Sequence, residues 1–224
     1  MEHYGDFGLY AKSNGISTSK LDYYAKNIDN SLTPYILEER QMNVTQMDVF
    51  SRLMMERIIW VAGVVNDGMS VVTQAQLMYL DSIDNNDITM HVDTPGGSVK
   101  SGLSMVDVMN YVSSDIRTIN TGIAASMGSI LLGAGTKGKR YSLKFSQTLL
   151  HQSSGGFQGN IQDAEIDMAA WKKQNENLFI LLGEYCDKSP EQVKKDATRD
   201  LWLTSEEALA YGIIDEIIIK KKNR

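Results

Sequence analysis

Short apolar runs alternate with segments of helical periodicity between residues 58 and 132, and this alternation constrains the fold more than any other feature. The runs Ile58–Val61, Ile88–Val92 and Ile116–Asn120 each fit a buried strand. Apolar residues recur at helical spacing over 72–80, 99–112 and 124–132. Strands that alternate with helices are typical of parallel βαβ units, whose strands are short and apolar because both of their faces are buried. The sequence therefore predicts an α/β fold.

The pattern changes after Gly138. Short strands are expected at Arg140–Leu143 and Thr148–Gln152, followed by a Gly-rich, exposed stretch over 153–159. Gln162–Tyr185 is one long helical segment. It is longer than a compact domain usually needs, so we expect part of it to pack on another subunit.

Helix-start and helix-stop signals mark the last part of the chain. Ser189 precedes a proline at the first helical position, which predicts a short helix. Thr204 and Glu207 have the spacing of a capping box, and Gly212 ends the helix that they start. We expect a final strand over Ile213–Ile219.

The ends of the chain differ from its middle. Residues 1–41 are rich in Ser, Asn, Tyr and Gly and lack sustained periodicity, so they are interpreted as an N-terminal extension, propeptide-like or disordered. Residues 42–219 form the predicted main domain, and 220–224 a basic tail, which is usually solvated.

Composition excludes several classes of function. The 224-residue chain is 42% apolar and 22% charged, as in an ordinary soluble globular protein, and its net charge of −6 argues against nucleic-acid binding. No apolar stretch is long enough to cross a bilayer, and no secretory signal is visible, so we expect a cytoplasmic protein without a membrane partner. Cys186 is the single cysteine, which excludes an intramolecular disulfide and fits a reducing compartment.

Histidine is scarce, and one of the three stands where a general base is commonly found. His3 lies in the extension and His91 inside a predicted strand, whereas His151 ends an apolar run and precedes the Gly-rich turn. A histidine at a strand end beside a loop is a common general base. Taken alone, His151 is more often a hydrogen-bonded strand-end residue.

Ser126 lies where a strand ends and a helix begins, among small neighbours. The run Gly122–Ser129 resembles a nucleophile elbow, with Ala124 in place of its usual first glycine. Such a position exposes the hydroxyl to a substrate and to the positive end of a helix dipole. By itself this pattern is weak, and a tight strand-to-helix turn explains it equally well.

Two further elements complete a possible acyl-transfer site. The glycines after Pro95 can expose backbone N–H groups that stabilise an oxyanion, and the N–H of Met127 is the natural second donor. An acid that orients the base is also needed. Asp200 is one candidate, and composition and spacing do not separate it from four competitors: Asp163, Asp167, Asp187 and Asp196.

Several motifs together are far more specific. Gly122–Ser129, Gly138–Tyr141 and Leu150–Gly159 resemble the proteolytic subunit of the Clp protease (ClpP) family. Other matching stretches, in the order of that family, are Phe50–Leu53, Glu56–Ile59, Thr94–Gly97, Thr198–Asp200, Leu203-Thr204, Glu206–Ala208 and Tyr211–Asp215. The resemblance runs from Met42 to Ile219. It implies a crotonase/ClpP-like spiral of βαβ units with a protruding handle, a strand plus a long helix, at about residues 154–186.

The resemblance implies roles for individual residues. Ser126 matches the nucleophile of the family, His151 the general base and Asp200 the orienting acid, which selects among the aspartates that spacing left open. Gly97 and Met127 match the residues whose N–H groups form the oxyanion hole. The implied activity is cleavage of unfolded polypeptides and short peptides by acyl transfer.

The resemblance also implies partners. Members of the family self-associate into two stacked heptameric rings around a closed chamber, and an AAA+ Clp ATPase unfoldase feeds them polypeptides. ATP is then the cofactor of the partner, and this chain itself would need neither a cofactor nor a metal; no Walker-type phosphate loop is visible.

The predicted docking pocket for the ATPase departs from the family pattern. Tyr111, Ile119 and Leu143 keep its positions, whereas Thr89 and His91 stand where the family usually has aromatic residues. The pocket is therefore more polar. Two other departures are the bulkier first strand, Trp60–Gly63, and the long N-terminal extension.

Three alternative functions remain open at the level of sequence. A non-catalytic subunit of a hetero-oligomeric ring would keep the fold without the triad. A crotonase-type acyl-CoA enzyme would share the fold and the oxyanion hole. A Ser–Lys peptidase would take its base from Lys137 or Lys144.

Overall fold

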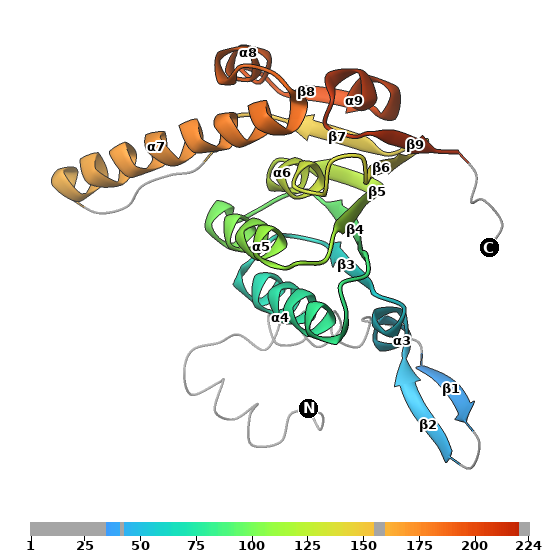
Figure 1. Cartoon of the computed structure of the whole chain (residues 1–224). Coiled ribbons are helices and arrows are strands. Elements are labelled where there is room, and N and C mark those ends of the chain that lie inside the picture. Colours follow the sequence, from blue (N-terminus) through green and yellow to red (C-terminus); the bar gives the residue numbers. More distant parts are fainter. Residues whose placement is uncertain (1–34, 41–42, 155–159, 220–224) are drawn as a thin grey trace, which may run out of the picture. The chain divides into compact units, whose positions relative to one another are not determined.

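A mostly parallel sheet organises the larger part of the molecule, as Figure 1 shows for the computed structural model, which describes residues 35–40, 43–154 and 160–219. The strands are β1 (Tyr35–Arg40), β2 (Asn43–Asp48), β3 (Ile58–Ala62), β4 (Ile88–Thr94), β5 (Ile116–Ala125), β6 (Arg140–Leu143), β7 (Gln147–Leu150), β8 (Leu201–Thr204) and β9 (Glu216–Ile218). The helices are α3 (Val49–Met55), α4 (Asp67–Ile83), α5 (Val99–Tyr111), α6 (Met127–Gly133), α7 (Ile161–Cys186), α8 (Pro190–Asp196) and α9 (Ser205–Tyr211).

The chain divides into two units, Met1–Arg52 and Leu53–Arg224. In the first, β1 and β2 pair as an antiparallel hairpin, from Tyr35 opposite Asp48 to Arg40 opposite Asn43. The domain boundary predicted at residues 41 and 42 falls between these two strands. The division into extension and main domain therefore stays a prediction, and residues 1–34 and 220–224 lie outside the described residues.

In the second unit, five parallel strands follow the order β3-β4-β5-β6-β9. The predicted α/β fold with parallel βαβ units is confirmed. β5 is long enough to pair twice: its first half pairs with β6, starting with Thr118 opposite Arg140, and its second half with β7, starting with Ile123 opposite Gln147. β8 then pairs antiparallel with β7 and was not predicted.

Three predicted bounds need correction. The strand expected to reach Gln152 ends at Leu150, and the helix expected from Ala124 begins at Met127. The last strand is β9 alone, because Ile213 and Ile214 are buried in the core after Gly212 has ended α9 in a left-handed conformation (φ 94°).

Helices α4, α5 and α6 lie along one face of the sheet (Figure 1). On β4 the residues on this face, Ile88, Met90 and Val92, are fully buried, and they join side chains of all three helices in the core. The alternate residues Thr89 and His91 are only half-buried. Burial on both faces was therefore the wrong expectation for this strand.

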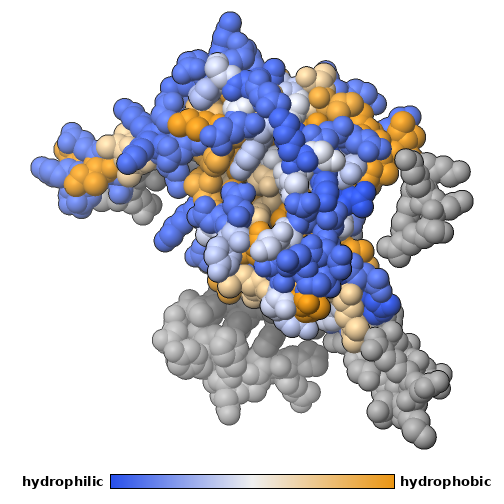
Figure 2. Space-filling model, in the orientation of Figure 1, coloured by the Kyte–Doolittle hydropathy of each residue, from blue (hydrophilic) through white to orange (hydrophobic). Residues whose placement is uncertain are grey.

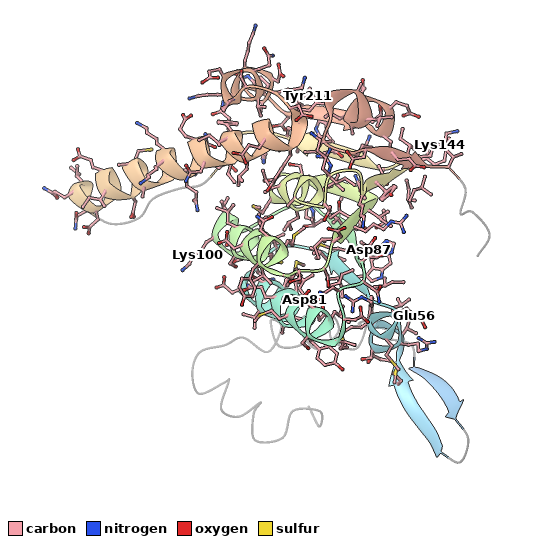
Figure 3. All side chains as sticks on the ribbon, in the orientation of Figure 1. Glu56, Asp81, Asp87, Lys100, Lys144 and Tyr211 are labelled. Atoms are coloured by element: carbon pink, nitrogen blue, oxygen red, sulfur yellow. The ribbon has the colours of Figure 1, made fainter. Side chains whose placement is uncertain are left out.

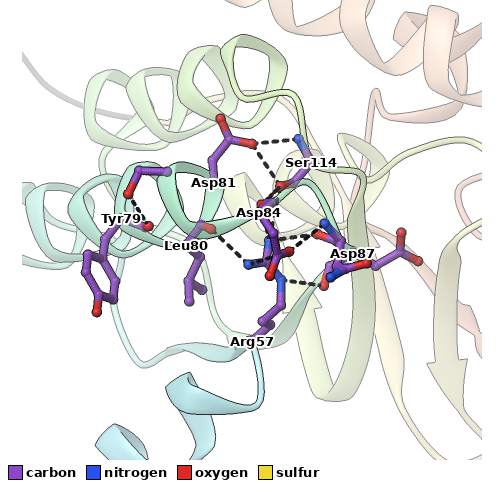
Figure 4. Close-up of polar contacts among 9 residues, drawn as sticks. Arg57, Tyr79, Leu80, Asp81, Asp84, Asp87 and Ser114 are labelled. Carbon is purple, nitrogen blue, oxygen red and sulfur yellow. Dashed lines mark hydrogen bonds and ion pairs between the residues drawn. The ribbon is translucent and has the colours of Figure 1, made fainter.

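Arg57 fastens the start of β3 to the end of α4, as Figure 4 shows. Its guanidinium donates to the carbonyl oxygens of Leu80 (2.8 Å) and Asn86 (2.7 Å) and to the hydroxyl of Ser114 (3.1 Å). The carboxylate of Asp84 lies 3.2 Å from the same group. One side chain thereby satisfies carbonyls that the end of a helix leaves without a partner.

Arg140 and Asp215 form a two-pronged ion pair that joins β6 to the segment before β9. The Nε and Nη2 of Arg140 lie 2.9 and 2.6 Å from the two carboxylate oxygens, and its Nη1 donates to the carbonyl of Tyr185 at the end of α7 (2.7 Å). The Arg140 side chain is 3% exposed. Burial raises the pKa of Asp215, but the hydrogen bonds and charge of Arg140 and the N–H of Gly138 lower it by more. The pKa therefore lies below its usual value, and the carboxylate stays charged.

Asp215→Asn should destabilise the protein, because it leaves the buried Arg140 charge without its counter-ion. The expected loss is on the order of 3 kcal/mol of unfolding free energy, measured by chemical denaturation. Asp187→Asn is the matched control, since Asp187 pairs with Lys137 at the surface with both side chains largely exposed. Similar denaturation midpoints for the two variants would contradict the structural role of Asp215.

Aromatic and charged residues line the face of the sheet opposite the helices. The rings of Trp60 and His91 stack with centroids 4.6 Å apart, and Arg117 lies over the ring of Tyr141. His91 Nδ1 is buried without a hydrogen-bond partner. Burial, and to a lesser degree the positive charge of Arg117, lower the pKa of His91 below 6.5.

His91 should make stability depend on pH in the acid range. Because its pKa is lower in the folded than in the unfolded protein, the unfolded chain binds more protons below pH 6.5. Its stabilising contribution is complete above pH 6.5 and falls as the pH drops toward the folded pKa. His91→Phe should lessen the decrease in melting temperature between pH 7 and pH 5. Thr89→Val, on the same strand face, should keep the decrease of the unmodified protein.

Candidate active site

Ser126 occupies a strained turn between β5 and α6. Its backbone has φ 56° and ψ −120°, a combination that residues other than glycine rarely adopt. Its N–H donates to the carbonyl of Leu149 on β7 (3.0 Å), which holds the turn against the neighbouring strand. The predicted elbow is confirmed in its backbone geometry.

The hydroxyl of Ser126 does not cap the helix that it precedes. The side chains at five other helix starts in this unit each accept a bond from the first turn: Asn66, Ser98, Asn160, Ser189 and Thr204. Capping by Ser, Thr or Asn normally stabilises a helix by about 1 kcal/mol. The local structure forgoes this bond at Ser126, and the hydroxyl remains available for chemistry.

The turn after β4 lies directly against Ser126. A Cβ on Gly96, whose φ is 92°, would stand 2.6 Å from the Cβ of Ser126 and 3.0 Å from the nitrogen of Met127. A Cβ on Gly97 would meet the carbonyl of Val65 at 2.3 Å. Only glycine fits at both positions, so the Pro-Gly-Gly sequence is what lets the two turns meet.

The backbone N–H groups of Gly97 and Met127 belong to the two turns that meet at Ser126. Val65 bonds to Gly96 and Ser98 on one side of the chain, so the N–H of Gly97 between them points to the other side. The N–H of Met127 is in the first turn of α6, where helices leave donors without intrahelical partners. Together the two donors have the chemistry required of an oxyanion hole.

His151 and Asp200 meet because β7 and β8 are paired. His151 follows Leu150, Asp200 precedes Leu201, and these two strand residues face each other. The Nδ1 of His151 lies 3.6 Å from Oδ1 of Asp200, longer than a hydrogen bond, with 24% of the His151 side chain and 64% of the Asp200 side chain exposed. The contact distinguishes Asp200 from its competitors, but sequence periodicity gave no sign of the strand that makes it.

Two of the four competing aspartates, Asp196 and Asp187, have partners elsewhere. Asp196 accepts from the hydroxyl of Tyr211, and Asp187 pairs with Lys137. Lys144 lies against the ring of Phe145 at the edge where β6 ends (Figure 3). Neither lysine lines the pocket at Ser126, which gives no support to a Ser–Lys pair.

A pocket joins Ser126 to His151. Met127, Ser129, Ser153 and Asn175 also line it, and its remaining walls are apolar: Val99, Ile130, Leu178, Phe179 and Leu182. Three of these five apolar residues come from α7. The enclosed volume is about 20 Å³, room for a single water molecule, so these residues are packed closely around Ser126 and His151.

Sequence reasoning missed the part played by Ser153 and Asn175. Asn175, in the middle of α7, accepts two hydrogen bonds from Ser153, which in turn accepts one from Trp171. The residues lie far apart in sequence and share no motif. No pattern in the chain could have revealed this contact.

Three of the predicted docking residues share the open face of the sheet. His91 pairs with Ile119 across β4 and β5, and Leu143 extends the same face on β6. Tyr111 instead ends α5, a helix of the covered face, and is 78% exposed. Within one chain, Tyr111 is therefore apart from the other three, and the docking pocket stays a prediction.

Two kinds of feature are missing from the described part of the structure. Among the residues that it describes, no three His, Cys, Asp or Glu side chains are grouped to hold a metal ion. No described helix combines the length and apolar character needed to cross a membrane.

Known proteins resemble the chain over almost its whole length. A family model described as Clp protease matches residues 40–221. The ATP-dependent Clp protease proteolytic subunit of Bacteroides fragilis is 48% identical over 218 residues, 96% of this chain and 99% of its own. The subunits of that name from Porphyromonas gingivalis and Streptococcus pyogenes are 46% and 42% identical, over 98% and 84% of this chain and 99% and 97% of their own.

Gly96→Ala should disable the site while the rest of the fold persists, because the added methyl group displaces Ser126 and Met127. Misplacing a reactive group by about 1 Å can cost a hundredfold in rate, measured as the rate at which a fluorophosphonate labels Ser126. Gly63→Ala is the control: Gly63 also has a positive φ (84°), but nothing lies within 4 Å of its added Cβ. Equal labelling rates in the two variants would contradict the importance of the close approach.

Proposed function

We propose, from the premise that this chain belongs to the Clp protease family, that Ser126, His151 and Asp200 are its catalytic triad. The broader prediction, a proteolytic subunit and thus a serine peptidase, is confirmed by relatives of that name that match nearly the whole chain. The observation that carries the residue assignment is the pocket lined by both Ser126 and His151. Asp200 lies beside Nδ1 of the same histidine.

The proposed reaction begins with attack by Ser126. Its Oγ adds to the carbonyl carbon of the scissile peptide bond, and the hydroxyl proton passes to Nε2 of His151. Asp200 accepts a hydrogen bond from Nδ1, which leaves Nε2 as the basic atom and stabilises the imidazolium. The 3.6 Å contact shortens to a hydrogen bond when the positive charge forms.

The oxyanion is stabilised by the N–H groups of Gly97 and Met127. Loss of one such donor typically costs a hundred- to a thousandfold in rate, on the order of 3 kcal/mol. His151 then protonates the leaving amine, and the acyl-enzyme remains. Water repeats the sequence with His151 as base, which releases the second product and restores Ser126.

Ring assembly belongs to the same proposal. The free end of α7 extends past the layers of its unit and carries apolar side chains, visible in Figure 2. Ile161 and Ile166 are 75% and 67% exposed. A shallow hollow on this helix end is lined by Ile161, Ala164, Met168 and Ala169, with Glu165 and Lys172 beside them. Exposed apolar surface of this kind favours contact with a second copy. Residues 155–159, which begin the predicted handle, lie outside the described residues.

The proposed partners follow from the family. The relatives are named as ATP-dependent, which implies an ATPase partner for them. We extend this to an AAA+ Clp ATPase that unfolds polypeptides and feeds them to two stacked heptameric rings of this chain. ATP is then used by the partner, and this chain contributes peptide cleavage without a cofactor. Cytoplasmic location is part of the same proposal.

Ser126→Ala should abolish peptide cleavage and labelling by a fluorophosphonate, and leave assembly unchanged, because the hydroxyl makes no structural bond. Turnover of a short fluorogenic peptide and size-exclusion chromatography measure both. Asp200→Asn should keep Ser126 as the labelled residue and should strongly reduce the rate of labelling. An assembled but unlabelled wild-type ring would instead support a non-catalytic subunit, and turnover of a CoA thioester a crotonase-type enzyme.

A further inference from the structure

The sheet holds the main chain that precedes His151, but not the main chain that follows it. Before His151, Leu150 and Leu149 pair with Leu201 and Trp202 of β8, and Leu149 also accepts the N–H of Ser126. After Leu150 the strand ends. The backbone that leaves His151 therefore has no ladder to fix it, and another contact is needed to set the direction of the ring.

Asp200 is a weak anchor for the imidazole in this state. Its side chain is 64% exposed, and its carboxylate oxygen is 3.6 Å from His151 Nδ1. Exposed pairs of this kind contribute little, because water screens them and both side chains lose freedom in holding one geometry. Asp200 can complete the alignment of His151, but it cannot supply the alignment alone.

A half-buried hydrogen-bond network supplies the missing contact. Oδ1 of Asn175 accepts from the N–H of Ser153 (3.0 Å) and from its hydroxyl (2.8 Å), and that hydroxyl accepts from Nε1 of Trp171 (2.7 Å). Every donor and acceptor role is compatible, because the hydroxyl gives one bond and takes one. Ser153 is two residues from His151, so the network grips the chain just beyond the base.

The two partners of Ser153 share one face of α7. Trp171 and Asn175 are four residues apart, the spacing that places side chains above each other on a helix. One turn further, Leu178, Phe179 and Leu182 anchor the same helix in the core. The grip on Ser153 is thus mounted on a rigid element, as precise positioning requires.

We infer that Asn175 and Trp171 are positioning residues for catalysis, which hold the backbone of Ser153 and so direct the His151 ring toward Ser126. This inference rests on the proposed triad. Asn175 also lines the pocket at Ser126, so a direct contact with the substrate side chain is the competing explanation. The two explanations predict different kinetics.

The test replaces Asn175 in the full-length protein. Asn175→Leu removes the acceptor at nearly the same size, and we expect kcat to fall about tenfold to a hundredfold, as for a small misplacement of a catalytic group. KM should change little, and the loss should be equal for peptides that differ in the side chain before the cleaved bond. Labelling by diisopropyl fluorophosphate, which has no such side chain, should slow by the same factor.

Asn175→Asp is the conservative variant. A carboxylate accepts both bonds from Ser153, so this variant should recover most of the lost kcat. Asn85→Ala, in the exposed loop before β4, is the remote control and should behave like the wild type. Ser153→Ala keeps the main-chain bond to Asn175 and removes only the hydroxyl bonds, so it should show a smaller loss. It serves as the deciding variant if Asn175→Leu fails to fold or assemble.

Three results would overturn the inference. The first is an unchanged kcat in Asn175→Leu, or in Ser153→Ala if Asn175→Leu does not fold. The second is a loss of kcat confined to one class of substrate side chain, with a normal labelling rate, and the third is no recovery of kcat in Asn175→Asp. Each of these outcomes requires an active wild type. Failure of the wild type to be labelled at Ser126 would instead reject the proposed triad, which keeps the two failures distinct.

Discussion

The close approach of two turns at the carboxyl ends of β4 and β5 is the constraint on which the site depends. Gly96 leaves the space that Ser126 and Met127 fill. At this contact Ser126 has a strained backbone, its hydroxyl does not cap α6, and the N–H groups of Gly97 and Met127 belong to the two turns that meet. Neighbouring parallel strands end at the same edge of a sheet, which is why this chemistry arises there.

Local signals were sufficient to predict most of the fold. Apolar runs identified β3, β4 and β5, and the capping box at Thr204 and the glycine at 212 marked both ends of α9. The strand β8 escaped detection because its apolar residues Leu201–Leu203 show no alternation and stand directly before the capping box, whose helix-start signal dominates this stretch. The half-exposed face of β4 was predictable, because Thr89 and His91 alternate with the apolar residues of the strand; the expectation of burial on both faces overlooked this alternation.

The candidate site was predictable only in part, because some of its contacts join segments that share no sequence signal. Ser126, His151 and the glycines lie at strand ends that the sequence displays, whereas the choice of Asp200 needed the family resemblance and then the pairing of β7 with β8. The contacts of Ser153 with Asn175 and Trp171 join segments without a shared motif. Contacts made through tertiary packing carry no periodic signal, and only the folded arrangement displays them.

The position of Asp200 along the chain has a consequence for synthesis. Ser126 and His151 belong to strands and turns that are complete by residue 151, but Asp200 precedes the strand that pairs last with β7. Ribosomes add about 5–20 residues per second, so a nascent chain passes seconds with the proposed nucleophile and base but without the proposed orienting acid. The order of the segments thus delays completion of the proposed triad until Asp200 and the strand β8 that follows it have been synthesised.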